Sequence, residues 1–511
     1  MEHFKKFLPL LLCAALLCGC AAVPEPEDEL PPASAGASSE EPAEEISALP
    51  EEFALPYYSG LTLDPVTCPD GVQQTAAALL CEGLFELDET FAPQPVLCAS
   101  YTRSEDCMTY TFALRPGALF SDGSALTAAA AADTLRRART SPRYAARLKE
   151  VASVTAEDGA VKIARSAPNA SLPALLDIPI VKAGTADAVP IGTGPYYLTP
   201  GGSGADAVLT ANPHWQGGKQ PVERIVLRDA KDADAMLYQF TSHETQLLTS
   251  DLTGTSPVSV TGSIHFYDAD STVFQYVGLN LSSPVLASSA VRRALAEGFD
   301  REQLVSAFLS GHAKAAQFPI SPASGDYPAA LDAAYSYSTF EQAMSAAGLA
   351  EGNSVPLRMI VNSENSFKVA AARQIAAQLS AFDLKIEVEA LVWEDYTAAL
   401  AAGEFDLYYG EVKLTADWDL RSLLATGGAL NYGGYSDAAL DSLLAACRSA
   451  EAPSTALLAV CRRLQTQAPI LPVCFKTVST LVQRGTLEGL PPTAANPFYR
   501  LADCTVHLRA Q

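Results

Sequence analysis

The chain has 511 residues, of which 34 are Lys or Arg and 58 are Asp or Glu, so its formal net charge is −24. At about 150 residues per domain, this length and a hydrophobic content of 49% predict roughly three domains and exclude a wholly disordered chain. Nucleic acids and anionic lipid surfaces are disfavoured as partners, because the acidic chain repels phosphate and has no Lys/Arg-rich run.

The N-terminus has the pattern of an export signal, with Lys5 and Lys6 before the apolar stretch Leu8 to Leu17. The whole apolar run contains Pro9 and is shorter than the about 20 residues that cross a bilayer comfortably. Leu17-Cys18-Gly19-Cys20 resembles a bacterial lipobox, which implies cleavage before Cys20 and a lipid anchor on its sulfur. The alternative is an ordinary signal peptide, residues 1–19, that contains cysteines by chance.

An acidic tether is predicted for residues 20–52. Residues 21–52 contain ten acidic residues and no basic one, with Pro, Ser and Ala among the rest. Such a segment buries too little apolar surface to fold, and its like charges repel. As a flexible coil it would span roughly 30 Å. We therefore expect a folded body beginning near Phe53 that is held close to a membrane on its outer face.

The cysteines and histidines give little support for a metal site, and we expect no cofactor. The eight body cysteines have no CxxC spacing, and no HExxH occurs. We expect most of these cysteines to be small buried apolar residues. An enzyme is not predicted: an exported hydrolase is the alternative from another class, but Gly201 to Ala205 fails the GxSxG pattern and no triad is recognisable.

Strand and helix patterns alternate along the body, which predicts an α/β fold. Residues 108–114 alternate as a strand, and Thr127 can cap a helix through Arg139. Two helices are expected within 288–311, the second beginning at Asp300, completed by Gln303 in a capping box and stopped by Gly311. Residues 357–361, a helix through Leu379 and residues 384–389 together form a βαβ unit.

Several stretches, in order, resemble one protein family. They are Leu63-Asp64-Pro65, Cys81-Glu82-Gly83-Leu84-Phe85, residues 110–128, Ile191-Gly192-Thr193-Gly194-Pro195-Tyr196, residues 212–215, residues 277–280, residues 291–295 and residues 299–302. This order is similar to the peptide-type solute-binding proteins of ABC importers, over about residues 60 to 510.

The resemblance implies a bilobal, periplasmic-binding-protein-like fold of type II with an extra subdomain on lobe I. Lobe I would then comprise 53–75, 190–272 and 467–511, the extra subdomain 76–189 and lobe II 273–466. The hinge crossings would fall near residues 276–280 and 470–475. The βαβ unit lies wholly inside the implied lobe II.

Three of these motifs have simple structural interpretations. Phe120-Ser121-Asp122-Gly123 predicts a turn in which Asp122 bonds its own backbone and Gly123 takes a positive φ. Residues 191–195 predict a tight loop in which the glycines allow close backbone crossing. Arg292 and Arg293, on a helix, are expected to be solvated or paired with acids.

Asp417 is the leading candidate for ligand binding, because the resemblance implies an aspartate in this segment that pairs with a ligand ammonium. The family often has Gly-Trp shortly before it, whereas this chain has Glu411-Val412-Lys413-Leu414. The alternative is helix capping by Asp417 or Asp419. Tyr276, Trp393 and Trp418 are candidates for an apolar cleft wall, and Tyr432 for the cleft mouth, with a place in the core as the alternative.

The resemblance implies a membrane-tethered receptor that captures a peptide or similar small solute and delivers it to an ABC permease. A nickel or metal-chelate carrier and a peptide-signal receptor are alternatives on the same fold. We expect a monomer on the extracytoplasmic face of the cell membrane, on the periplasmic side if the cell is Gram-negative.

Overall fold

The computed structural model describes residues 49–68, 71–187, 189–201, 204–349, 355–382, 384–450 and 452–509. The predicted signal peptide, Cys20 and residues 20–48 of the predicted tether lie outside the described residues. Among the helices that are described, none combines the length and the apolar character needed to cross a membrane.

Lobe I, as we use the term, is built on a four-stranded sheet in the order β1-β10-β9-β8, in which β1 runs parallel to β10. The first strand begins at Phe53 and all five of its residues are buried. The elements of this lobe are β1 (Phe53–Tyr57), α1 (Gly71–Ala78), β8 (Tyr196–Thr199), β9 (Ala207–Ala211), β10 (Arg224–Asp229), α3 (Ala233–Thr241), β11 (Leu247–Ser250), β18 (Leu487–Glu488) and β19 (Thr505–Val506).

The extra subdomain contains an antiparallel sheet in the order β4-β5-β7-β6, with α2 packed on it. Thr127 caps α2 by accepting a hydrogen bond from the Ala130 N–H, as the sequence predicts. The elements are β2 (Phe85–Leu87), β3 (Pro93–Pro95), β4 (Cys98–Arg103), β5 (Thr109–Leu114), α2 (Ala128–Ala138), β6 (Val151–Glu157), β7 (Ala160–Arg165) and a short 3-10 helix (Leu172–Leu175).

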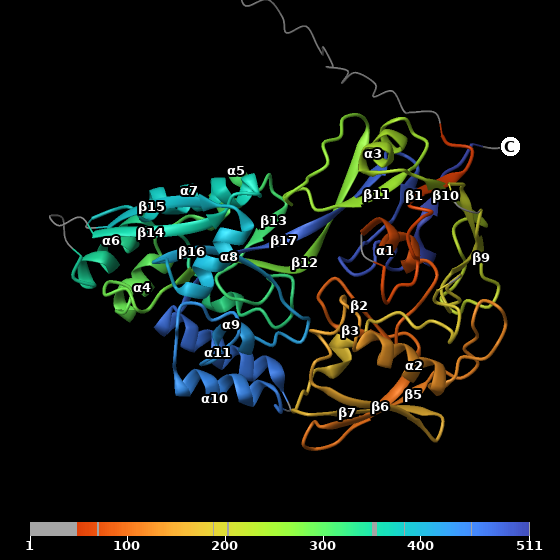
Figure 1. Cartoon of the computed structure of the whole chain (residues 1–511), viewed down its shortest axis with the longest axis horizontal. Helices are drawn as coiled ribbons and strands as arrows, with labels where there is room; N and C mark the ends of the chain where they lie inside the picture. The colour runs from red at the N-terminus through yellow and green to blue at the C-terminus, as the bar shows by residue number, and fades with distance from the viewer. Residues whose placement is uncertain are drawn as a thin grey trace, which may run out of the picture. The chain divides into compact units, whose positions relative to one another are not determined.

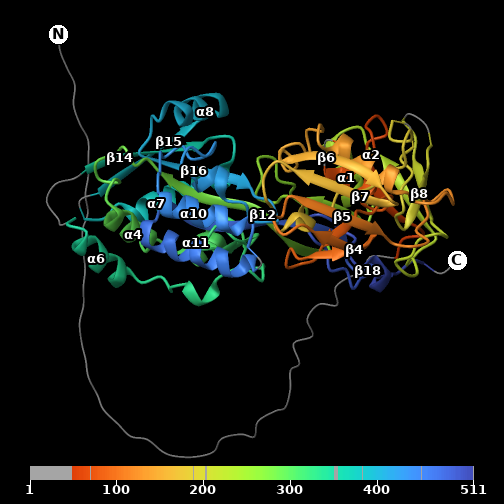
Figure 2. The same cartoon turned by 90° about the horizontal axis from the view of Figure 1, so that it is seen from below.

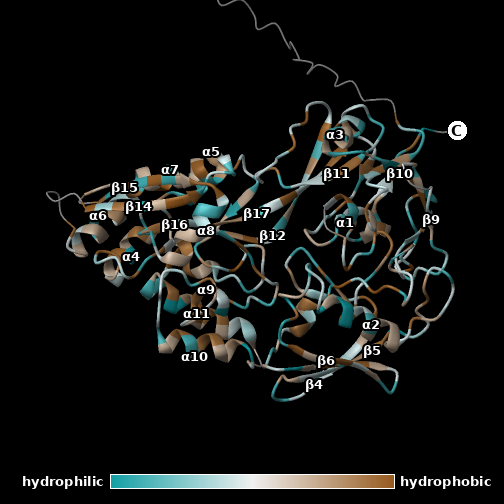
Figure 3. Cartoon of the chain, viewed as in Figure 1, coloured by the Kyte–Doolittle hydropathy of each residue, from teal (hydrophilic) through white to brown (hydrophobic). Residues whose placement is uncertain are grey.

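Lobe II contains the predicted βαβ unit, in which β14 and β15 are parallel neighbours and α7 packs on both. Hydrophobic residues fill much of β14 (Figure 3), because helices and loops cover it. The elements are α4 (Ser289–Ala296), α5 (Arg301–Phe308), β13 (Ala313–Ala315), a 3-10 helix (Ala329–Leu331), α6 (Tyr337–Ala346), β14 (Val355–Asn362), α7 (Ser366–Leu379), β15 (Leu384–Leu391), α8 (Trp393–Ala402), β16 (Leu407–Lys413), α9 (Arg421–Leu424), α10 (Ala438–Cys447) and α11 (Pro453–Gln467).

Two long antiparallel strands, β12 (Ile264–Leu279) and β17 (Ile470–Gln483), pass between the lobes (Figures 1 and 2). Residues 264–270 of β12 pair with 477–483 of β17, beside β11 of lobe I. From Phe274 onward β12 pairs with both β17 and β16 of lobe II. The ladder is irregular between Asp270 and Phe274. The predicted lobe boundaries and hinge positions stay predictions.

Two side chains differ from the sequence-based expectation. Asp300 caps α5 by accepting from the Gln303 N–H at 3.0 Å, but the Asp300 N–H donates to Gln378 on α7 at 3.1 Å rather than to Gln303. The predicted capping box is therefore wrong in its second half. Arg292 is neither solvated nor paired with an acid, because it is buried and donates to four backbone carbonyls. The helix α5 ends at Phe308, three residues before the predicted stop at Gly311, and both Ser310 and Gly311 have a positive φ.

The turn and cysteine predictions are confirmed. Asp122 accepts a hydrogen bond from the Ser124 N–H at 3.1 Å, and Gly123 has φ of +81°. Seven of the eight cysteines among the described residues are buried and Cys447 is half-buried, and Cys81, Cys98, Cys107, Cys447, Cys461, Cys474 and Cys504 are free thiols. Burial raises the pKa of several of these thiols, to about 11 for Cys98 and Cys447, so they stay protonated at neutral pH.

Candidate functional site between the extra subdomain and lobe II

The loop that follows β16 carries Asp417 against the extra subdomain. Its carboxylate accepts hydrogen bonds from Asn169 Nδ2 at 2.8 Å and from Arg448 Nη1 at 3.3 Å. The Asp417 side chain is 2% exposed, and Thr415 donates to it at 2.5 Å. Asp419 rather than Asp417 accepts from the backbone at the start of α9, through the Arg421 N–H at 3.2 Å. The Asp417 carboxylate is thus buried and hydrogen-bonded where lobe II contacts the extra subdomain.

Trp418 lies at the same contact, buried and with φ of +50°. Its ring meets the Phe91 ring edge to face at 5.5 Å and the Phe475 ring at 6.1 Å. It also lines a cavity of about 310 Å³ together with Tyr101 of the extra subdomain and Asp326 of lobe II. The sequence motif Asp417-Trp418 therefore faces the extra subdomain through both of its side chains.

The other three aromatic candidates lie elsewhere in lobe II. Tyr276 is buried, with its hydroxyl 3.3 Å from that of Tyr408, and burial raises its pKa to about 12. Tyr432 meets the Tyr408 ring edge to face at 5.9 Å. Trp393 starts α8 and is 56% exposed. The structure brings Tyr276 and Tyr432 together through Tyr408, and it places Trp393 on the surface.

The interlobe cavity, as we call it, has a volume of about 220 Å³ and lies between residues 146–175 of the extra subdomain and residues 412–448 of lobe II. The loop after α10 meets the subdomain here (Figure 1), where the Ala170 N–H donates to the Arg448 carbonyl at 2.8 Å. The charged residues that line this cavity are Arg147, Lys149, Glu150, Arg165, Lys413, Asp417, Asp419 and Arg448.

Glu150 is the centre of an ion-pair network at the interlobe cavity. It accepts from Arg165 Nη2 at 2.9 Å, from Arg421 Nη2 at 2.7 Å and also from Arg448 Nη2. Two of these three partners, Arg421 and Arg448, belong to lobe II. The network therefore joins the extra subdomain to lobe II directly, in an enclosed place where charge pairs are weakly screened.

Sequence analysis missed Glu150, Arg165, Asn169 and Arg448. One signal was available for Arg165, because it shares the alternating face of β7 with the buried Val161 and Ile163. A basic residue on the apolar face of a strand requires a partner, since an unpaired buried charge is costly. No comparable pattern marks Glu150 or Arg448, whose pairing joins residues 298 positions apart.

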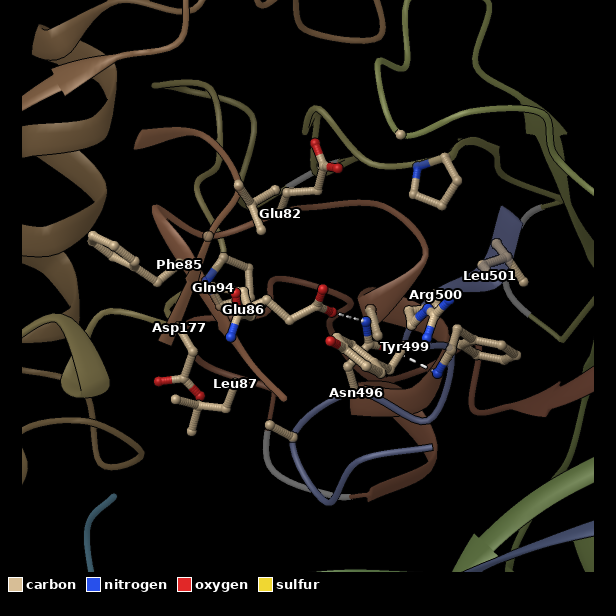
Figure 4. A pocket seen from close by; sticks show the side chains of 18 of the residues that line it. Glu82, Phe85, Glu86, Leu87, Gln94, Asp177, Asn496, Tyr499, Arg500 and Leu501 are labelled. Carbon is tan, nitrogen blue, oxygen red and sulfur yellow. Dashed lines mark hydrogen bonds between the residues drawn. The ribbon is translucent and has the colours of Figure 1, made fainter. Parts of the chain in front are cut away.

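A second cavity, of about 370 Å³, lies where lobe I joins the extra subdomain (Figure 4). Glu82 at this cavity accepts from Trp215 Nε1 and from Thr193 Oγ1, both at 2.8 Å. Burial raises the pKa of Glu82. Three of the family-like stretches, around residues 82, 193 and 215, therefore meet at one carboxylate and have a structural role there.

Glu86 at the same cavity gives a prediction about pH. It accepts from Asn496 Nδ2 at 2.5 Å (Figure 4), and burial raises its pKa from 4.5 to about 7. The pKa of Glu86 is higher in the folded state than in the unfolded state. Its contribution to the free energy of unfolding is therefore fully present below pH 4.5 and is lost as the pH rises through 7. We expect Glu86→Gln to raise the free energy of unfolding by about 2 kcal/mol at pH 8 and little at pH 5.

Urea unfolding at the two pH values measures this effect. The exposed Glu89→Gln is the matched control and should change stability equally little at both. An equal gain for Glu86→Gln at pH 5 and pH 8 would contradict the prediction.

Comparisons with known proteins agree with this architecture. A family model described as "Bacterial extracellular solute-binding proteins, family 5 Middle" matches residues 92–427. The glutathione-binding protein GsiB of Salmonella typhi is 27% identical over 427 residues, covering 77% of this chain and 82% of GsiB.

Two solved structures share the fold. The periplasmic murein tripeptide-binding protein MppA in its unliganded open form has a TM-score of 0.73 at 18% identity, covering 90% of this chain and 98% of MppA. A nickel ABC transporter structure from Bacillus halodurans has a TM-score of 0.73 at 16% identity, covering 88% of this chain and 98% of its own. The predicted bilobal fold is thereby confirmed.

Proposed function

Since the chain belongs to the bacterial extracellular solute-binding proteins of family 5, we propose that it captures a peptide or similar small solute and delivers it to an ABC import permease. The observation that carries this proposal is the interlobe cavity, which is lined by polar side chains from both the extra subdomain and lobe II. A ligand seated there touches two parts of the chain at once. It stabilises the closed form by its differential affinity, and closure is what a permease can recognise.

Asp417 and Trp418 are the proposed ligand contacts, because each lines a cavity at this contact. Asp417 would orient a ligand ammonium through a charge-assisted hydrogen bond, and Trp418 would supply an apolar wall. Tyr276, Trp393 and Tyr432 stay predictions as ligand contacts. No covalent step is part of this function.

A thermal-shift screen of residues 53–511 tests the function. We expect a mixed tripeptide library at millimolar concentration to raise the melting temperature by several degrees, because ligand that binds only the folded state stabilises it by mass action. A nickel–histidine chelate is the comparison ligand, since the relatives named above include a glutathione-binding, a murein tripeptide-binding and a nickel transport protein. A shift with the chelate and none with peptides would replace the peptide by a metal chelate as the ligand.

The proposal also places the body, as a monomer, on a lipid anchor at Cys20 with residues 20–52 as its tether. The support is the order of apolar stretch, lipobox-like sequence and acidic segment. We expect Cys20→Ser, expressed in a bacterium with lipoprotein processing, to move the protein from the detergent phase to the aqueous phase of a Triton X-114 partition. The unchanged protein should remain in the detergent phase. Aqueous partitioning of both forms would contradict the anchor.

A further inference from the structure

The interlobe cavity is cationic in a protein that is acidic overall. Five basic and three acidic residues line it, whereas the whole chain has 34 basic and 58 acidic residues. The three acids already have partners. Glu150 and Asp419 pair with Arg448 and Arg421, and Asp417 pairs with Arg448. With Arg421 and with Asp177, the ion-pair partner of Arg147, this group contains six basic and four acidic residues, so positive charge stays in excess.

Three arginines of this cavity have donor groups without an acceptor among the described residues. They are Arg147 Nε and Arg165 Nη1 of the extra subdomain and Arg448 Nε of lobe II. Arg165 and Arg448 are buried, with 5% and 8% exposure. A buried guanidinium N–H without a partner is unfavourable and uncommon. Three residues that line one cavity therefore have donor groups that the chain's own acceptors leave unused.

Lys413 adds a further cation at the end of β16. It is within salt-bridge distance of no carboxylate among the described residues, and the carboxylate that acts on it, Asp177, is already paired with Arg147. Burial and the nearby Arg143 and Arg147 lower its pKa. It also stands in the segment where the similar family often has Gly-Trp. Like charges held this close, from the extra subdomain and from lobe II, are stabilised when an anion lies between them.

We infer that the interlobe cavity binds a carboxylate of the ligand, and that the ligand is an acidic peptide with a net negative charge. The two termini of a peptide cancel each other's charge, so the excess of cations selects for acidic side chains. The two oxygens of a carboxylate have about four acceptor positions, which suffice for the one unpartnered nitrogen of each of Arg147, Arg165 and Arg448. These donors are enclosed when the extra subdomain and lobe II are in contact. The anion would therefore enter while the protein is open, and closure would hold it in place.

This inference rests on the proposed function, and one experiment separates the two. Residues 53–511 are incubated with an equimolar random tripeptide library, and the bound peptides are identified by mass spectrometry. We expect peptides with Asp or Glu to be enriched about tenfold over those with Asn or Gln. A bound pool without acidic enrichment would overturn the inference and leave peptide capture intact.

Thermal shifts with succinate and citrate complete the design. If no peptide is retained but these anions raise the melting temperature, the peptide function fails and the anion site stands. If neither peptides nor anions bind, both fail.

Lys413→Gln tests the site itself, because Lys413 has no ion pair whose loss would unfold the protein. We expect about tenfold weaker binding of an enriched acidic tripeptide, and a smaller decrease of affinity between 50 and 300 mM KCl than in the unchanged protein. The exposed Lys385→Gln on β15, whose partner is the exposed Glu387, is the matched control and should bind like the unchanged protein. Equal affinity of the Lys413→Gln and Lys385→Gln proteins would overturn the inference.

Discussion

Replacing Arg292 by methionine is expected to lower the free energy of unfolding by about 4 kcal/mol. The Arg292 guanidinium donates to the carbonyls of Leu286 and Ala287 at 2.8 Å, and to those of Gln467 and Ala468 at 2.8 to 3.1 Å. A methionine of similar length fills the space but leaves these buried acceptors without donors. Chemical denaturation followed by far-UV circular dichroism measures the loss.

Arg293 provides the matched control for this prediction. It follows Arg292 on α4 but is exposed. We expect Arg293→Met to change stability by less than about 0.5 kcal/mol, as surface substitutions usually do. Similar losses for the two variants would mean that the carbonyl contacts of Arg292 contribute little, and that both effects come from helix propensity or solubility.

Replacing Gly192 by alanine is expected to destabilise the protein by about 3 kcal/mol or more. A Cβ at this position would lie 2.2 Å from the Leu80 carbonyl oxygen and 2.4 Å from Cys81 Sγ. The contact is with backbone, which cannot rotate away as a flexible side chain can. The predicted close crossing of the 191–195 loop is thus confirmed, and its partner is the segment that begins the Cys81-Glu82-Gly83 stretch.

The control for Gly192 is Gly60→Ala, because a Cβ there meets nothing within 4 Å. Differential scanning calorimetry of the two variants should show a melting temperature several degrees lower for Gly192→Ala alone. Equal melting temperatures would show that the loop shifts at low cost, and that the close crossing is not a constraint on the fold.

Local patterns predicted local structure well. The Thr127 cap, the Asp122 turn and the βαβ unit each depend on residues within about 35 positions of one another, and their hydrogen bonds and alternation are short-range. The family resemblance extended the prediction to two lobes. No periodicity in the chain could have supplied that, because the lobe I sheet pairs residues from distant segments.

Side-chain partners across large separations were not predictable in the same way. The capping box at Asp300 was half right because Gln378, on another helix, takes the place expected for Gln303. The sequence pattern places Arg292 on the surface, whereas the structure buries it. Its acceptors include backbone carbonyls near residue 467, and a backbone carbonyl is not marked by any residue type in the sequence. The cationic lining of the interlobe cavity likewise depends on contacts between charged residues far apart in the sequence, and the order of residues along the chain does not predict such contacts.

The paired strands β12 and β17 have a mechanical consequence. A two-stranded ribbon resists stretching along its length, because each strand holds the other in register, but it bends and twists readily where its ladder is interrupted. The ladder is interrupted between Asp270 and Phe274 and shifts register again between Gln275 and Tyr276, whereas the pairing of residues 264–270 with 477–483 is regular. We therefore expect movement of one lobe against the other to include rotation about this stretch, close to the predicted hinge crossings near residues 276–280 and 470–475. The segment that carries Asp417 packs on this stretch, because the Leu414 N–H donates to the Thr272 carbonyl at 2.9 Å and the Trp418 ring lies 6.1 Å from the Phe475 ring, so we expect a bend of the ribbon to move the candidate ligand contacts with it.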